Sequence, residues 1–295
     1  MDYQTILTED KDGVATVTFN RPDRMNAYTA RLGLEVRHAI VTFDRREDVR
    51  AIVVTGAGRA FCAGADLAAG ADTFSGGGGG GSRGGVMTDR SADELRIDDR
   101  REYWEMNTPI IAAINGHAIG VGLTMPMQWD IRVAAEEAKL AFAFSRRGVI
   151  PELSANWIVP RIVGVSRGLE LLMTGRTFSG REAAEMGLVS EALPADQVLA
   201  RALDLARDIA ENVAPVSAGI VKRLVYSNLA EPDRPAAQRR EGALFGWTTG
   251  QPDSREGPMA FLEKRSPQWR LSKNADFPEE VFAEGAPGAQ PSRAE

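Results

Sequence analysis

The segment at residues 109–124, PIIAAINGHAIGVGLT, constrains the fold of this chain more than any other stretch. Residues 110–114 form an unbroken apolar run after a proline, which is the pattern of a strand buried on both faces. Asn115 and Gly116 then predict a turn, and Gly120 precedes a short apolar run that can start a helix. We therefore predict a buried strand, a glycine-rich turn and a helix, which together form a unit of α/β proteins.

A strand that runs through such a turn into a helix leaves several amide hydrogens without partners, and they point toward one place. That place suits an anion, or an oxygen atom that becomes negative during a reaction. Glycine-rich turns of this kind also occur in α/β proteins simply because they pack tightly. The segment at residues 109–124 therefore predicts a functional site only together with a second segment.

The second segment is GAGRAFCAGADL at residues 56–67, which follows a predicted buried strand at residues 51–55. Its first residues resemble a dinucleotide-binding fingerprint, but the third glycine of that pattern falls on Phe61, so we reject a Rossmann site. The small residues around Ala65 instead place its amide in a loop at a strand end, where it can face the same space as the amide of Val121. Two such amides predict an oxyanion hole.

Composition excludes several other classes of function. The 295 residues include 35 Lys and Arg against 41 Asp and Glu, a net charge of −6, and no basic stripe, so we expect no nucleic-acid partner. The single cysteine, Cys62, excludes an internal disulfide and favours a reducing compartment. The sequence shows neither a signal peptide nor an apolar run of membrane-spanning length, so we expect a soluble cytoplasmic protein without membrane contact.

The pattern of the whole chain predicts an α/β fold in three parts. Residues 1–200 form the core, with a flexible glycine-rich insertion at about residues 70–90 that lacks the Lys and Ser or Thr of a phosphate-binding loop. Residues 201–269 form a helical C-terminal part, and residues 270–295 form a disordered tail.

Two helices of the core have recognisable starts. Apolar residues recur at helical spacing over residues 29–47, and Thr29 can cap that helix. A charged helix is expected at residues 91–107, with Ser91 and Glu94 forming a capping box.

With both loops identified, the sequence resembles the enoyl-CoA hydratase/isomerase (crotonase) superfamily. The resemblance rests on NRPDRMNA at residues 20–27, the two glycine-rich segments, Asp130 after the predicted helix, SRRGVIPE at 145–152, VPRIVG at 159–164 and AFLEKR at 260–265. It covers residues 3–269 in order and spacing. The resemblance implies a spiral of ββα turns closed by a helical C-terminal part, assembly as homotrimers or as hexamers made of two trimers, and acyl-CoA thioesters as substrates of fatty-acid metabolism.

The resemblance also assigns site residues. The oxyanion hole falls on the backbone amides of Ala65 and Val121. Positions similar to substrate- or CoA-binding positions of the family are Arg24, Ala63, Asp66, Leu67, Gly120, Thr124, Phe144, Phe261 and Lys264. Of these, Phe261 and Lys264 resemble residues that reach the nucleotide from a neighbouring subunit. No metal and no cofactor other than the CoA of the substrate is implied.

The departures from the family pattern concern catalysis. Hydratases of this family use two glutamates to hold and split water, but those positions are Thr124 and Phe144 here, and neither side chain is an acid or base at neutral pH. Glu152 falls where the isomerase branch carries its catalytic carboxylate. One base beside an oxyanion hole suffices to convert 3-enoyl-CoA into 2-enoyl-CoA, so we predict isomerisation with Glu152 as the base. The alternative role for Glu152 is to cap the following helix.

Other functions stay open at this point. A 2-enoyl-CoA hydratase of β-oxidation, a non-catalytic acyl-CoA binding protein, and a crotonase that hydrolyses or decarboxylates thioesters could each use the same hole. His117 and Cys62 neighbour the two loops, but packing explains both residues better than catalysis does. His38 is expected to face solvent from the first helix.

Overall fold

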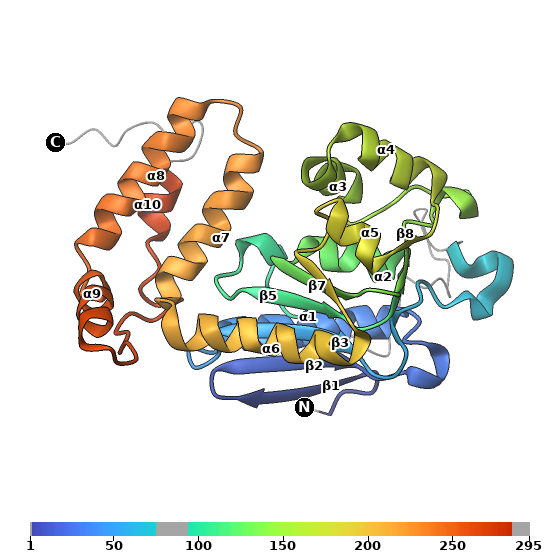
Figure 1. The fold of residues 1–295 in the computed structure, drawn as a ribbon, viewed down its shortest axis with the longest axis horizontal. Helices are drawn as coiled ribbons and strands as arrows, with labels where there is room; N and C mark the ends of the chain where they lie inside the picture. Colours follow the sequence, from blue (N-terminus) through green and yellow to red (C-terminus); the bar gives the residue numbers. More distant parts are fainter. Residues whose placement is uncertain (1, 75–93, 285–295) are drawn as a thin grey trace.

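The computed structural model of the chain describes residues 2–74 and 94–284. Figure 1 shows a mixed α/β body that carries the first two thirds of the chain, and a set of helices, α7 to α10, that stands beside it. This arrangement agrees with the predicted α/β core and helical C-terminal part.

The larger sheet has six strands in the order β1-β2-β3-β5-β7-β10. Their bounds are Ile6–Lys11, Val14–Phe19, Ala51–Gly56, Ile110–Ile114, Ile131–Ala135 and Glu191–Leu193. The strands β1 and β2 form an antiparallel hairpin, and β2, β3, β5, β7 and β10 are parallel. Every residue of β3 and β5 is buried, because the two strands lie inside the sheet and both faces are covered.

The smaller sheet has four strands in the order β4-β6-β8-β9, with bounds Ala60–Cys62, His117–Ile119, Lys139–Ala141 and Phe178–Ser179. The strands β4 and β6 are parallel, and Cys62 pairs with Ala118. Their carboxyl ends therefore meet at one edge of the sheet. The loop after β4 and the loop after β6 are the two predicted glycine-rich loops, so the sheet brings them side by side.

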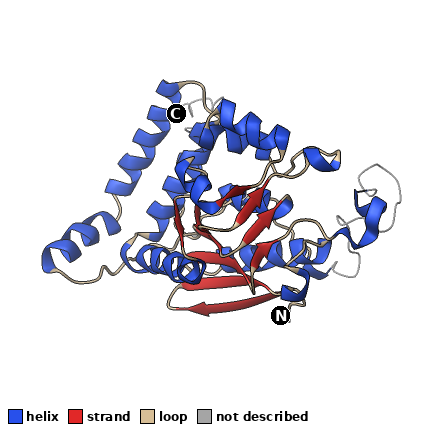
Figure 2. Cartoon of the chain, turned by 45° about the vertical axis from the view of Figure 1, so that its right-hand side comes forward, coloured by secondary structure: helices blue, strands red, loops and turns tan. Residues whose placement is uncertain are grey.

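Helices cover the sheets (Figure 2). The α-helices α1 to α10 are Ala30–Arg45, Val121–Thr124, Ala155–Val163, Val165–Thr174, Gly180–Glu185, Ala195–Asn212, Pro215–Leu229, Arg234–Thr249, Asp253–Glu263 and Glu279–Glu284. Short 3-10 turns are η1 Pro22–Arg24, η2 Leu67–Phe74, η4 Tyr103–Glu105, η5 Met125–Gln128 and η6 Ser145–Arg147. As predicted, Thr29 caps α1, since its side chain accepts a hydrogen bond from the amide of Leu32. Among the described residues, no helix is both long and apolar enough to cross a membrane.

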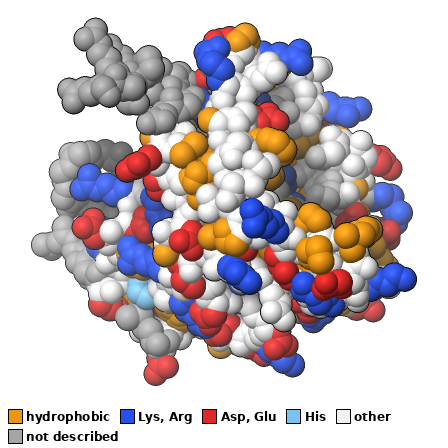
Figure 3. All heavy atoms as spheres, turned by 90° about the vertical axis from the view of Figure 1, so that its left-hand side faces the viewer, with side chains coloured by type: hydrophobic (Ala, Val, Ile, Leu, Met, Phe, Trp, Pro, Cys, Tyr) orange, Lys and Arg blue, Asp and Glu red, His pale blue; other side chains and the backbone are white. Residues whose placement is uncertain are grey.

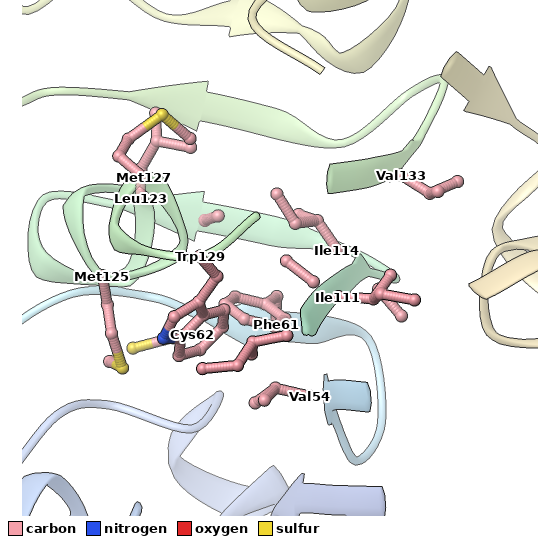
Figure 4. Packing of buried hydrophobic residues seen from close by; sticks show 14 of the residues in the cluster. Val54, Phe61, Cys62, Ile111, Ile114, Leu123, Met125, Met127, Trp129 and Val133 are labelled. Atoms are coloured by element: carbon pink, nitrogen blue, oxygen red, sulfur yellow. The ribbon is translucent and has the colours of Figure 1, made fainter. Parts of the chain in front are cut away.

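The core beneath the two loops is packed around Trp129 (Figure 4). Its indole ring is fully buried and meets the ring of Phe61 edge-on, with centroids 6.4 Å apart. Leu123 of α2 and Cys62 of β4 belong to the same cluster of buried hydrophobic residues. A cluster of this kind resists local shifts, because a close-packed interior leaves side chains little room to move. The loops therefore rest on a rigid base.

Two predictions about regular structure are wrong. The helix expected at residues 91–107 is absent from the described part of that range, residues 94–107, where η4 is one short turn in largely irregular chain. In the tail expected to be disordered at residues 270–295, the described residues 270–284 are ordered and include α10. Lys273 is buried, its ammonium group donates a hydrogen bond to the backbone oxygen of Asp44, and its own carbonyl accepts one from Asn107. These buried hydrogen bonds explain why residues 270–284 are ordered although their composition predicted disorder.

The predicted boundary at residue 200 also differs from the structure. The helix α6, Ala195–Asn212, crosses it and packs along the larger sheet against β3, β5 and β7. Val198, Ala202 and Ala206 are the buried residues of α6 and recur every four positions. The helical C-terminal part therefore begins with α7.

Candidate active site

The loop after β4 fixes the direction of the Ala65 amide. Gly64 has a φ of 98°, a backbone conformation that glycine adopts without a steric penalty. The carbonyl oxygen of Gly64 accepts a hydrogen bond from the amide of Tyr28 at 2.7 Å. In a planar trans peptide the C=O and N–H bonds point in opposite directions, so this bond turns the N–H of Ala65 away from Tyr28.

The loop after β6 fixes the Val121 amide in the same way. Gly120, with a φ of 55°, directs its carbonyl oxygen into α2, where it accepts hydrogen bonds from Leu123 at 2.8 Å and Thr124 at 3.0 Å. The N–H of Val121 belongs to the same peptide unit and therefore points out of the helix. As the first residue of α2, Val121 has no acceptor within the helix.

Both amides border one cavity of about 270 Å³. The residues that line it are Tyr28, Ala63, Gly64, Ala65, Leu67, Phe74, Ile119, Gly120, Val121, Ala143, Phe144, Arg147, Val149, Ile150, Glu152 and Leu153. Within the described part of the chain, neither Ala65 N nor Val121 N donates a hydrogen bond to another backbone group. Two fixed, unused N–H donors at one apolar cavity are suited to stabilise an oxygen atom on which negative charge develops.

Glu152 lines the same cavity and is held by Thr124. The hydroxyl of Thr124 donates a hydrogen bond to Glu152 Oε1 at 2.6 Å, and Thr124 itself is fully buried. Burial raises the pKa of Glu152 above its usual value, and the hydrogen bond from Thr124 lowers it only in part. A carboxylate with a raised pKa is a better general base than an exposed one. Among the described residues, Glu152 is the only acidic side chain that lines the cavity.

The turn that follows Glu152 has an unusual backbone. Leu153 and Ser154 both have positive φ angles, 52° and 56°, although neither is glycine. Such residues each cost about 1–3 kcal/mol and persist where surrounding contacts hold them, which occurs often at functional sites. Here Gln128 holds the turn, because its side-chain amide donates to the carbonyl of Leu153. The Glu152 carboxylate accepts a hydrogen bond from the hydroxyl of Thr124 and not from an amide of α3, which disfavours the alternative that Glu152 caps this helix.

The structure places the other predicted site residues in two groups. Ala63, Leu67, Gly120 and Phe144 line the cavity. Thr124 lies behind Glu152, which it contacts, and is not a cavity-lining residue.

Asp66 and Arg24 lie outside the cavity. The carboxylate of Asp66 forms an ion pair with Arg21 at 3.0 Å. The side chain of Arg24 is 68% exposed, and its nearest ionic partner is Asp23 at 3.9 Å. Any contact of Arg24 with coenzyme A phosphates stays a prediction.

Phe261 and Lys264 lie on α9 and at its end, in the helical C-terminal part. Phe261 is 83% exposed and Leu262 is 73% exposed, and Figure 3 shows hydrophobic side chains among charged ones at this end of the molecule. Exposed hydrophobic side chains of this size are common where another subunit binds. The trimer or hexamer, and the contact of these residues with a neighbour's nucleotide, stay predictions.

The sequence did not identify several cavity residues. Tyr28 directly follows the NRPDRMNA segment and lines the cavity. Arg147 also lines the cavity. The sequence alone could not place Tyr28 at the cavity, because its position depends on hydrogen bonds to residues far away in the sequence, such as Gly64.

The remaining titratable residues near the loops do not reach the cavity. Burial raises the pKa of the Cys62 thiol to about 12, so it stays protonated at neutral pH. His117 accepts a hydrogen bond from the amide of Lys139 at 3.1 Å, and burial lowers its pKa. His38 is half-buried and paired with Tyr3 at 2.7 Å, so the expectation that it faces solvent is wrong.

Comparison with known proteins agrees with this geometry. The sequence model of a family described as enoyl-CoA hydratase/isomerase matches residues 9–272. An enoyl-CoA hydratase from Alternaria alternata, ACTT3, is 35% identical over 282 residues, which cover 94% of this chain and 89% of the relative. A 1,2-epoxyphenylacetyl-CoA isomerase from Escherichia coli is 32% identical and covers 90% of this chain and 97% of its own.

A solved structure shares the fold. The crystal structure of a probable enoyl-CoA hydratase/isomerase from Mycobacterium abscessus superposes with a TM-score of 0.79 at 39% identity, covering 90% of this chain and 98% of that one. The names of the similar proteins thus include both hydratases and an isomerase of acyl-CoA thioesters.

Proposed function

This chain belongs to the enoyl-CoA hydratase/isomerase family of enzymes acting on acyl-CoA, and we propose that its reaction is the isomerisation of 3-enoyl-CoA to 2-enoyl-CoA. Glu152 is the proposed base, and the amides of Ala65 and Val121 are the proposed oxyanion donors. The observation that carries the proposal is that Glu152 is the one carboxylate among the described residues lining the cavity that both amides border.

The proposed reaction needs one proton carrier. The carboxylate of Glu152 removes a proton from C2, and the electron pair of that C–H bond moves toward the thioester carbonyl. The resulting dienolate has negative charge on oxygen, which the amides of Ala65 and Val121 stabilise more strongly than they stabilise the neutral carbonyl. The protonated Glu152 then returns the proton to C4, and the double bond ends between C2 and C3. The substrate is rearranged without gain or loss of atoms, so this proton transfer requires no cofactor beyond the CoA of the substrate.

The residues that replace the hydratase glutamates favour this reaction over hydration. Thr124 and Phe144 stand at those positions. The hydroxyl of Thr124 donates a hydrogen bond to Glu152, and Phe144 lines the cavity. Hydration requires a group to hold and deprotonate water in addition to the proton donor. A single carboxylate serves one proton at a time, which suits transfer between two carbons of the same substrate.

The test is a product analysis on a panel of acyl-CoA thioesters. We expect 3-enoyl-CoA to be converted to 2-enoyl-CoA, with an increase in the absorbance of the conjugated thioester and no change in mass. Hydration of 2-enoyl-CoA would add one water and would support the hydratase alternative that the relatives' names suggest. Tight binding of thioesters without turnover of any panel member would indicate a non-catalytic acyl-CoA binding protein.

Replacing Thr124 by valine is expected to shift the pH dependence of isomerisation. The hydroxyl of Thr124 stabilises the ionised form of Glu152, so its loss raises the pKa of Glu152 further. The acid limb of kcat/KM should therefore move to higher pH, while the rate on the alkaline plateau stays within roughly threefold, because valine has nearly the same shape as threonine and Glu152 is ionised there. Thr124→Ser, which keeps the hydroxyl, is the control. An acid limb that does not move would show that the hydrogen bond does not act on the titrating group.

A further inference from the structure

The loop at residues 20–28 contacts the loop that carries Ala65 through Arg21. Its guanidinium Nη2 lies 3.0 Å from Asp66 Oδ2, and its Nη1 donates a hydrogen bond to the carbonyl oxygen of Ala27. The side chains of Arg21 and Asp66 are each 21% exposed, so water screens this pair less than it screens a pair on the open surface. Neither side chain lines the cavity.

Two planar peptide units connect the guanidinium to the Ala65 amide. The carbonyl of Ala27 and the N–H of Tyr28 belong to one unit, and that N–H donates to Gly64 O at 2.7 Å. The carbonyl of Gly64 and the N–H of Ala65 belong to the next unit. A continuous series of hydrogen bonds therefore runs from the cation of Arg21 to the N–H of Ala65, which faces the cavity.

We propose that Arg21 is a positioning residue for catalysis, which aims the Ala65 N–H at the substrate oxygen and strengthens it as a donor. A carbonyl that accepts a hydrogen bond withdraws electron density from its own N–H, and in a series of such bonds each strengthens the next by about 10–30%. The positive charge of Arg21 at one end of the series and the negative charge that develops on the substrate oxygen at the other end polarise the intervening peptide units in the same direction. The proposal rests on the proposed function, in which Ala65 is an oxyanion donor.

Asp66 holds this arrangement from the other side of Ala65. Its amide donates to Tyr28 O at 2.9 Å, and its second carboxylate oxygen accepts from the amide of Ala68 at 3.1 Å. The peptide units before and after Ala65 are thus both tied to Tyr28. The carboxylate of Asp66 therefore holds both Arg21 and its own loop in place. These contacts account for an acidic residue at this position without the substrate contact predicted from the sequence.

Asn26 fixes the loop of Arg21 to the strands. This fully buried side chain accepts from the amide of Arg21 at 2.8 Å, and it donates to the carbonyl oxygens of Ala57 at 2.9 Å and Ala60 at 2.8 Å. Ala60 is the first residue of β4, the strand that leads into the Ala65 loop. The position of the guanidinium is thus set by the same strand that presents the donor, which keeps the geometry fixed before substrate binds.

The test compares Arg21→Met with the wild type in two readouts. The first is the infrared stretch of a ¹³C-labelled thioester carbonyl in a saturated acyl-CoA, which binds but has no double bond to move. We expect the stretching frequency to fall when the thioester binds to the wild-type protein. The decrease on binding to Arg21→Met should be smaller. The second is turnover, for which we expect kcat to fall on the order of tenfold with KM changed less than threefold, a smaller loss than removal of a whole donor causes.

Two further variants make the result decisive. Arg46→Met removes another arginine that forms ion pairs with aspartates, Asp10 and Asp48, but lies outside this series, and it should leave both readouts unchanged. Arg21→Lys keeps the charge without the two-pronged geometry, and it should give values between wild type and Arg21→Met.

An unchanged carbonyl frequency in Arg21→Met would overturn the inference, even if turnover fell, because the loss would then be structural. Unchanged turnover would overturn it as well. If the wild-type protein itself produced no carbonyl shift, the oxyanion hole and the proposed function would fail together.

Discussion

Replacing Glu152 by glutamine is expected to lower kcat for isomerisation by about 10²- to 10⁴-fold, the usual contribution of a positioned general acid or base. Glutamine keeps the size of the side chain and can still accept a hydrogen bond from Thr124, but it cannot take a proton from C2. Binding of a saturated acyl-CoA should change little, because the cavity keeps its shape. Steady-state kinetics on 3-enoyl-CoA and calorimetric binding of the saturated thioester measure the two effects separately.

The matched control is Glu152→Asp, which keeps a carboxylate but shortens the side chain by one methylene. It should retain part of the activity and an acid limb in its pH profile, whereas Glu152→Gln should lose the limb. If Glu152→Gln turned over 3-enoyl-CoA at the wild-type rate, the base would have to be another group and the proposed mechanism would be wrong.

The same substitution should also change stability, in the opposite direction from activity. The pKa of Glu152 is raised above 4.5 in the folded protein, so between 4.5 and the folded pKa the folded state binds more protons than the unfolded state. Stability contributed by this group is therefore present below pH 4.5 and is lost as pH rises through the folded pKa. Glu152→Gln removes this titration, so we expect a higher melting temperature than wild type at neutral pH and no difference of that kind at low pH.

Replacing Val121 by proline should lower kcat by about 10²- to 10³-fold, which is the usual cost of losing one oxyanion donor. Proline has no N–H, and Val121 is the first residue of α2, a position that tolerates proline because its amide has no partner within the helix. Gly120 before it has no Cβ, which removes one of the clashes that a proline ring makes with the preceding residue. The substitution therefore removes the donor while the helix can keep its start.

Val121→Ala is the control, because it removes the same side chain but keeps the amide. It should retain most of the turnover, and the ratio of the two variants isolates the contribution of the N–H. Circular dichroism and the melting temperature show whether Val121→Pro is folded. A folded Val121→Pro enzyme with the kcat of Val121→Ala would mean that this amide does not stabilise the transition state.

The sequence predicted the parts of the fold that depend on local pattern. The buried strand at β5 and the cap of α1 at Thr29 each follow from an apolar pattern or a capping residue. The α/β architecture and the family also followed from the order of motifs, and the family model and the solved structure confirm both. The assignment of roles to Glu152, Ala65 and Val121 stays a prediction until the variants above are measured.

The sequence could not predict features that depend on contacts between distant segments. The hydrogen bond between Thr124 and Glu152 joins residues 28 positions apart, and the sequence alone did not indicate it. The helix at residues 91–107 was predicted from a capping pattern and from charge, and that prediction is wrong. In the structure, buried residues of this range such as Met106 lie in irregular chain that packs into the core. Local propensity is a weak guide where tertiary packing decides the conformation.

The contact between Lys273 and Asp44 joins two residues 229 positions apart, and Asp44 also accepts bonds from the amides of Asn107 and Thr108. Translation delivers Asp44 long before Lys273, so a growing polypeptide on the ribosome must leave the end of α1 without this contact until Lys273 has been added. The α/β core is thus completed by a segment that is synthesised after all of its described strands.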